Sequence, residues 1–209
     1  MSSTRPAAVA GVFYPDQASD LRATLARCAG DARPPAIDMP GPPKLLVVPH
    51  AGYVYSGPVA ASAYALLASA RGITRVVLLG PVHRVPVRGL AAPTDDVFET
   101  PLGGVPVDQA MLAQLDGLPQ LERSDVVHAF EHSIEVQLPF LQETLREGFA
   151  LVPLAVGDAA PAEVAEVLER LWGGPETVIV ISSDLSHYLP YEQAQERDRK
   201  TVDRILAFD

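Results

Sequence analysis

Apolar residues recur along the chain in two distinct patterns. Short unbroken apolar runs are typical of buried strands, and apolar residues spaced three or four apart are typical of helices. The runs lie at residues 45–48, 76–79, 151–156 and 178–181. Helical spacing is found near residues 20–29, 57–70, 108–115, 133–145, 162–172 and 192–208. Because strands and helices alternate, we predict an α/β fold, with one domain over residues 1–209 and a largely parallel or mixed sheet flanked by helices on both faces.

Two segments interrupt this alternation. Val97–Thr100 and Gly104–Val107 flank a Leu-Gly pair, which is typical of a β-hairpin or of paired edge strands. Residues 34–43 are rich in proline, which predicts a rigid surface loop.

The composition narrows the range of functions. A net charge of −10 argues against nucleic-acid binding, because phosphates need a basic surface. No apolar stretch is long enough to span a bilayer, and the N-terminus lacks the apolar run of a signal peptide. We therefore expect a cytoplasmic protein whose partners include neither nucleic acid nor membrane. The single cysteine, Cys28, excludes an internal disulfide and a cysteine-rich zinc site.

Three of the five histidines share one kind of position. His50, His83 and His187 each fall at or just past the end of a predicted buried strand. Ligands of open α/β sheets bind at the carboxyl edge of the strands. Histidine is the commonest metal ligand and the side chain that titrates near neutral pH. Strands that are distant in sequence would therefore bring three imidazoles to one pocket.

Asp184 precedes His187 by three residues, so a helical turn would place both side chains on one face. The carboxylate would then bind a metal together with the imidazole, or orient the ring and raise its basicity. A simpler interpretation is that Asp184 or a neighbouring serine caps the next turn. A Ser-His-Asp triad is a further alternative, although the chain has no Gly-x-Ser-x-Gly motif.

Two further histidines, His128 and His132, lie in the sequence His-Ala-Phe-Glu-His, which matches the H-x-x-E-H motif of inverted zinc peptidases. That chemistry requires both histidines on one continuous helix. Ser133 also fits the N-cap of a separate helix, so the alternative is a polar loop that precedes a helix.

Seven segments, in the same order along nearly the whole chain, resemble the Memo family, also called protein B of the AmmeMemoRadiSam system. They are Ala10–Pro15, Pro49–Gly57, Leu79–His83, Thr100–Gly103, Glu131–Pro139, Val152–Gly157 and Ser182–His187. The family is similar in fold to class III extradiol dioxygenases, which are non-haem Fe(II) enzymes that cleave aromatic rings. The resemblance therefore implies a dioxygenase-like fold.

The resemblance also implies roles for individual residues. His50 and His83 match the two metal-ligand histidines of the family. His187 matches the acid/base histidine of the dioxygenases, with Asp184 beside it. His132 matches a further histidine that lines the pocket, which argues against a peptidase.

The third metal ligand is a separate question. The resemblance implies that family members continue past residues 208–209 and carry there a cysteine that binds the metal. No cysteine follows Cys28 in this chain. We therefore expect either that Asp184 or His187 completes the site or that no metal is bound.

The leading hypothesis is a redox or dioxygenase-like protein that holds Fe(II) or Cu on His50 and His83 and acts on an unknown substrate. His187, Asp184 and His132 would be its catalytic residues. One alternative is a non-catalytic adaptor for a small molecule or a phosphotyrosine peptide, with Arg84 and Arg88 near the phosphate. Another, implied by the family's naming alone, is an accessory protein of a radical-SAM pathway.

Overall fold

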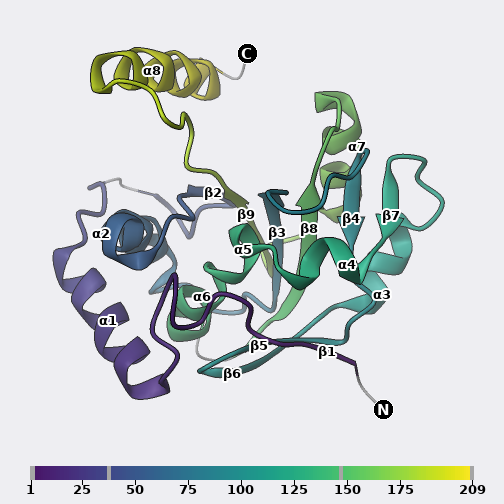
Figure 1. Cartoon of the computed structure of the whole chain (residues 1–209), viewed down its shortest axis with the longest axis horizontal. Coiled ribbons are helices and arrows are strands. Elements are labelled where there is room, and N and C mark those ends of the chain that lie inside the picture. The colour runs from purple at the N-terminus through teal and green to yellow at the C-terminus, as the bar shows by residue number, and fades with distance from the viewer. Residues whose placement is uncertain (1–2, 37–38, 146–147, 208–209) are drawn as a thin grey trace.

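The computed structural model describes residues 3–36, 39–145 and 148–207, and it confirms the mixed α/β class (Figure 1). Its main sheet has six strands in the order β2-β9-β3-β8-β4-β7. Their bounds are β2 Leu45–Val48, β3 Arg75–Pro81, β4 Leu90–Ala92, β7 Leu121–Arg123, β8 Ala150–Val156 and β9 Thr177–Ser182. The strands β2, β9, β3 and β8 are parallel, whereas β4 runs antiparallel to β8. The four parallel strands therefore present their carboxyl ends at one edge.

A smaller sheet joins β1 (Thr4–Arg5), β5 (Val97–Thr100) and β6 (Gly103–Pro106), in the order β1-β5-β6. The antiparallel pairing of β5 with β6 confirms the predicted hairpin. The N-terminal strand β1 pairs in parallel with β5, a contact between segments more than ninety residues apart.

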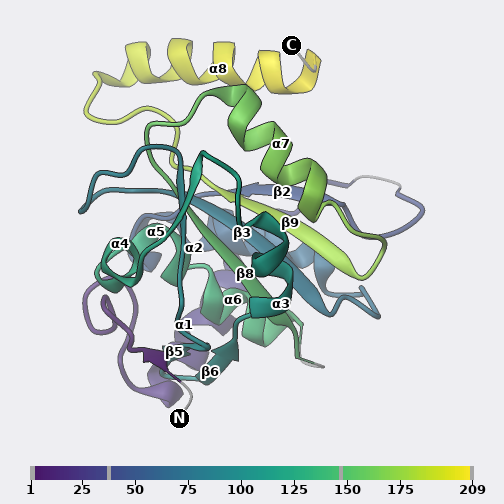
Figure 2. The ribbon, with the colours of Figure 1, turned by 90° about the vertical axis from the view of Figure 1, so that its right-hand side faces the viewer.

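Helices cover both faces of the main sheet (Figures 1 and 2). On one face lie α2 (Tyr53–Tyr64) and α6 (Leu138–Thr144), with α1 (Ala18–Asp31) packed against α2. On the other face lies α7 (Pro161–Leu171). The short helices are η1 Ala65–Leu67, α3 Gln109–Leu112, η2 Ala113–Leu115, α4 Asp125–Ala129 and α5 His132–Glu135. The apolar face predicted for the first helix is buried, with Leu21, Leu25 and Cys28 in the core.

The helix predicted over residues 133–145 is wrong in one respect, because the chain forms two helices there. Helix α5 ends at Glu135 and α6 begins at Leu138, with Pro139 in its first turn. Proline is favoured in the first turn because the amide that it lacks would have no partner within the helix. The short helix α5 is therefore separate from α6, and its first residue, His132, lies beside His50 and His83.

The last helix, α8 (Tyr191–Ala207), projects away from the sheet (Figure 1). None of its described residues is buried, and the apolar stripe of Val202, Ile205 and Leu206 is exposed. Residue 208, where we predicted the end of this helix, lies outside the described residues.

Within the described part of the chain, every helix is too short or too polar to cross a membrane.

Candidate metal centre

Three imidazoles meet at the carboxyl edge of the main sheet. His50 follows β2, His83 follows β3, and His132 is the first residue of α5. One ring nitrogen of each lies within 4.8 Å of those of the other two, a separation that one metal ion can bridge. The ring centroids of His50 and His83 are 5.2 Å apart, and those of His83 and His132 are 4.5 Å apart. The three histidines therefore form a group that could hold a metal ion.

The third member of this group differs from the expectation. Asp184 or His187 was expected to complete a two-histidine site, whereas the ring nitrogens that lie close enough for one metal ion include that of His132, which was expected to line the pocket. The physical reason is the break between α4 and α5, which places the start of α5 beside β3. His132 thus faces the other two rings from across the pocket, and Phe13 packs against it with ring centroids 4.5 Å apart.

The ring of His50 is buried and its orientation is set by Ser182. The Nδ1 atom of His50 lies 2.9 Å from the hydroxyl oxygen of Ser182, which itself donates to the Ser133 carbonyl at 2.6 Å. Because Ser182 donates its hydroxyl proton to the Ser133 carbonyl, its oxygen accepts from Nδ1–H of His50. The same oxygen also accepts from the Gln137 amide at 2.9 Å. This tautomer leaves the lone pair of Nε2 unused. In the described residues, Nε2 of His50 is buried without a hydrogen-bond partner.

Glu131 contacts both of the other histidines. Its Oε1 atom lies 2.8 Å from Nδ1 of His83, and its Oε2 atom accepts the backbone N–H of His83 at 2.5 Å. The same Oε1 accepts the backbone N–H groups of His132 at 2.9 Å and Ser133 at 3.0 Å. Burial opposes ionisation, but these hydrogen bonds outweigh it and lower the pKa of Glu131. The carboxylate is therefore a permanent negative charge beside the imidazoles.

Two of the three histidines, His50 and His132, are held neutral by burial. Burial lowers the pKa of His50 to about 4, against the opposing effect of Asp184. Burial also lowers the pKa of His132, against the opposing effect of Glu131. Neutral imidazole is the form that binds metals, so these two rings are ready for a metal at neutral pH. Nδ1 of His132, like Nε2 of His50, is buried without a hydrogen-bond partner among the described residues, although it lies 3.4 Å from Oε1 of Glu131. A metal ion would satisfy such atoms.

Asp184 and His187 lie at the rim of this group. Oδ1 of Asp184 accepts the backbone N–H groups of His50 at 2.5 Å and Ala51 at 3.2 Å. Its Oδ2 is 3.7 Å from Nε2 of His50 and 3.8 Å from Nε2 of His187. The His187 ring is half exposed and is held through Nδ1 by its contact with the Leu185 carbonyl at 3.0 Å. The carboxylate therefore stands between a buried imidazole and a solvent-facing one.

The zinc-peptidase alternative fails on geometry. Helix α4 ends at Ala129, and Glu131 is extended, so His128 and His132 do not share a continuous helix. The ring of His128 points into the core and donates from Nε2 to the Ala91 carbonyl at 3.0 Å. The two histidines of the motif therefore serve different parts of the molecule.

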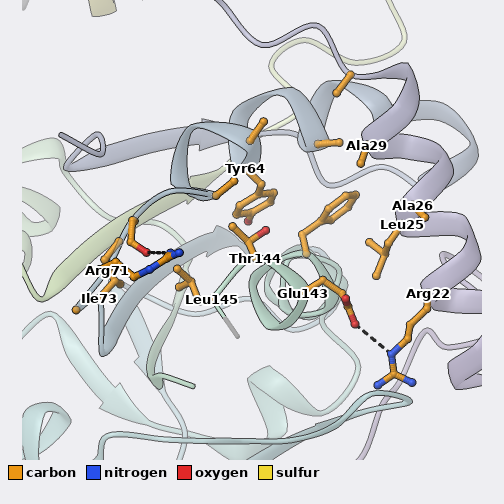
Figure 3. Close-up of a pocket in the computed structure, with 17 residues that line it drawn as sticks. Arg22, Leu25, Ala26, Ala29, Tyr64, Arg71, Ile73, Glu143, Thr144 and Leu145 are labelled. Atoms are coloured by element: carbon orange, nitrogen blue, oxygen red, sulfur yellow. Dashed lines mark hydrogen bonds and ion pairs between the residues drawn. The ribbon is translucent and has the colours of Figure 1, made fainter. Parts of the chain in front are cut away.

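A cavity lies elsewhere in the molecule (Figure 3). Its volume is about 570 Å³, and it opens between α1, α2 and α6. Alanine side chains make up much of its wall, and its charged residues are Arg22, Arg71 and Glu143. Arg22 and Glu143 form an ion pair of 3.2 Å across it. None of the five histidines lines this cavity, so the candidate chemistry belongs to the sheet edge.

Sequence reasoning missed three supporting residues. Glu131 was considered only as part of a peptidase motif, and Ser182 and Gln137 were not singled out for any role. The signal available for Glu131 was its position directly before His132. Nothing in the sequence indicated that Ser182 and Gln137 meet, since they are 45 residues apart.

Comparisons with known proteins agree with these features. The family model described as Memo-like protein matches residues 5–209. A MEMO1 family protein of Methanopyrus kandleri is 41% identical over 223 residues, covering 98% of this chain and 76% of the relative. One from Ignicoccus hospitalis is 36% identical, with 98% and 76% covered, and one from Aquifex aeolicus is 37% identical, with 93% and 71% covered. The family model and these relatives together show that the chain belongs to the Memo family.

Proposed function

We propose that the protein is a metal-dependent, dioxygenase-like or redox protein whose centre is held by His50, His83 and His132. The observation that carries this proposal is the convergence of three ring nitrogens within 4.8 Å. Two of the rings, those of His50 and His132, carry a buried nitrogen without a hydrogen-bond partner among the described residues. Imidazole ligands suit iron and copper, and three ligands leave positions open for a substrate. Fe(II) or Cu is accordingly the proposed cofactor, and it would supply redox chemistry at this edge of the sheet.

The surrounding residues would handle protons and exclude water. Asp184 lies between His50 and His187, so it is placed to hold the His187 imidazolium or to receive a proton from it. His187 is half exposed and can exchange that proton with solvent. On the opposite side, the ring of Phe13 packs against that of His132 and would limit the access of water to it. His132 consequently acts as a ligand in this proposal, while Asp184 and His187 move the proton.

The decisive experiment measures metal content. Wild-type protein is loaded anaerobically with Fe(II) or Cu(I), desalted and measured by mass spectrometry, beside the variants His50→Ala, His83→Ala and His132→Ala. We expect about one metal per chain in the wild type, and a loss of at least tenfold in affinity for each variant. The matched control is His128→Gln, a change at a buried histidine outside the group, which should retain the metal. Wild-type protein that stays metal-free, or a His132→Ala variant that binds as tightly as wild type, would contradict the proposal.

The phosphopeptide-adaptor alternative is less well supported. Of the two arginines that would serve it, Arg88 donates to both carboxylate oxygens of Glu163, at 2.9 and 2.8 Å. That guanidinium is therefore already paired. A partner in a radical-SAM pathway remains a hypothesis that co-purification would test.

A further inference from the structure

Glu131 connects two of the three histidines through a single buried carboxylate. We propose that Glu131 is a positioning residue that sets the tautomer of His83 and holds His83 and His132 in a fixed relation to each other. This inference rests on the proposed metal centre, because it concerns how that centre's ligands are oriented.

The hydrogen bonds of Glu131 carry the inference. An ionised carboxylate only accepts, and it offers about four lone-pair directions. Four N–H donors use them: the ring and the backbone of His83, the backbone of His132 and the backbone of Ser133. Because the carboxylate has no proton to give, the hydrogen between it and His83 belongs to Nδ1. In the neutral ring, which is the form that binds a metal, the lone pair of His83 is consequently on Nε2.

The backbone of Glu131 is held as firmly as its side chain. The residue is extended between α4 and α5, and its side chain is 1% exposed. Its carbonyl accepts from Nη2 of Arg5 at 2.8 Å, and the carbonyl of His128, three residues earlier, accepts from Nε of Arg5 at 2.7 Å. Arg5 therefore anchors the turn that carries the carboxylate. A metal ligand that donates its other ring N–H to a fixed carboxylate is oriented before the metal arrives.

Glu131 also caps α5. The effect of losing this cap on stability therefore has to be separated from the effect of losing the carboxylate on the orientation of the histidines. Glu135 provides the matched control. It is a second buried carboxylate on the same helix, bonded to Arg5, Tyr14 and the backbone of residues 8 and 9, and it contacts none of the three histidines. Loss of the Glu135 charge therefore perturbs the same region of the fold without removing a hydrogen bond to any of the three histidines.

The experiment compares Glu131→Gln with Glu135→Gln in Co²⁺ titrations followed by visible absorption. In Glu131→Gln the new amide N–H₂ must face at least one N–H donor, so the four bonds cannot all persist. We expect Co²⁺ binding 10- to 100-fold weaker than wild type in Glu131→Gln and within threefold of wild type in Glu135→Gln. Thermal unfolding of both metal-free variants shows how far stability alone accounts for the difference.

A second measurement needs no metal. Long-range ¹H–¹⁵N correlation spectra of metal-free wild-type protein, with His83 assigned from a His83→Gln variant, should show His83 as the Nδ1–H tautomer. An Nε2–H tautomer, or Co²⁺ affinities of Glu131→Gln within threefold of wild type, overturns the positioning role. If wild-type protein binds no Co²⁺, the proposed function fails, while the tautomer still decides whether Glu131 orients the ring.

Discussion

The carboxylate of Asp184 lies against both the backbone and the ring of His50: Oδ1 accepts the backbone N–H at 2.5 Å, and Oδ2 lies 3.7 Å from Nε2. The relationship follows from the sheet, since β2 and β9 are neighbouring parallel strands and Val48 pairs with Ser182 at their ends. The turn that leaves β9 therefore delivers its carboxylate to the turn that leaves β2. Asp184 both shapes the backbone at the histidine and presents a charge to its ring.

These two roles of Asp184 can be separated by substitution. Asp184→Ala removes the acceptor for two backbone N–H groups and should lower the free energy of unfolding by about 1–3 kcal/mol. Asp184→Asn keeps an acceptor for the backbone and should stay within about 1 kcal/mol of wild type while removing the charge beside His50 and His187. Urea unfolding of both variants checks this. Equal losses of unfolding free energy in Asp184→Asn and Asp184→Ala would show that the hydrogen bonds to the backbone contribute little.

Close packing at Gly80 should control the position of α5. A Cβ atom on Gly80 would lie 2.5 Å from Oγ and 3.0 Å from Cβ of Ser133, which is fully buried. Gly80→Ala should therefore push α5, and His132 with it, away from β3, at a cost of about 1–3 kcal/mol in unfolding free energy. Metal affinity should fall as well. Unfolding curves and Co²⁺ titration of the variant measure the two effects.

Gly30 is the matched control for that substitution. Gly30 lies in α1, where an added Cβ would meet no atom within 4 Å. Gly30→Ala should raise the free energy of unfolding by about 0.5–1 kcal/mol and leave metal binding unchanged. Unchanged metal affinity in both glycine variants would mean that α5 accommodates the methyl group without moving His132.

Stability should fall in mild acid because of His128. Burial lowers the pKa of this histidine to about 4, assisted by Arg5 and opposed by its bond to the Ala91 carbonyl. In the unfolded chain the pKa is about 6.5, so the unfolded state takes up a proton first as the pH falls. The free energy of unfolding is therefore unaffected above pH 6.5 and decreases between pH 6.5 and about 4, by roughly 3 kcal/mol from this group.

The variant His128→Gln isolates that contribution. Glutamine keeps an amide donor for the Ala91 carbonyl but does not titrate, so the variant should lose less stability than wild type between pH 7 and pH 4.5. Urea unfolding at several pH values gives the difference in slope. Parallel pH profiles for the two proteins would assign the acid sensitivity to other groups.

A buried ion pair should account for the attachment of the N-terminal strand. Nη1 of Arg5 lies 2.7 Å from Glu135, and both side chains are at most 2% exposed. Arg5→Met leaves the Glu135 charge buried without its cation, which should cost about 3–5 kcal/mol of unfolding free energy. A double-mutant cycle with Glu135→Gln measures the coupling. Strictly additive losses would show that the two residues act independently.

Much of the fold could be predicted because its signals are local. The apolar runs at β2, β3, β8 and β9 and the hairpin of β5 and β6 were read correctly from the order of residues alone. Prediction failed where tertiary contacts decide the backbone. The split between α5 and α6 depends on packing against β3. The break that separates His128 from His132 was one of two alternatives left open by the sequence, and it is held by the bonds that Arg5 makes to the carbonyls of His128 and Glu131.

The features of the candidate site also fall into two groups, those that the sequence indicated and those that only the structure shows. The sequence by itself determined that His50 and His83 stand at strand ends, because a buried parallel strand has a recognisable composition and its carboxyl end faces the ligand edge. Only the tertiary structure showed that His132 joins His50 and His83 in one group, that Glu131 accepts hydrogen bonds from His83 and His132, and that His187 stays at the rim. The contacts of His50 with His83, of His83 with Glu131 and of His50 with Asp184 join residues that are 33, 48 and 134 positions apart. Sequence spacing carries no information about such distances until the strand order brings the segments to one edge.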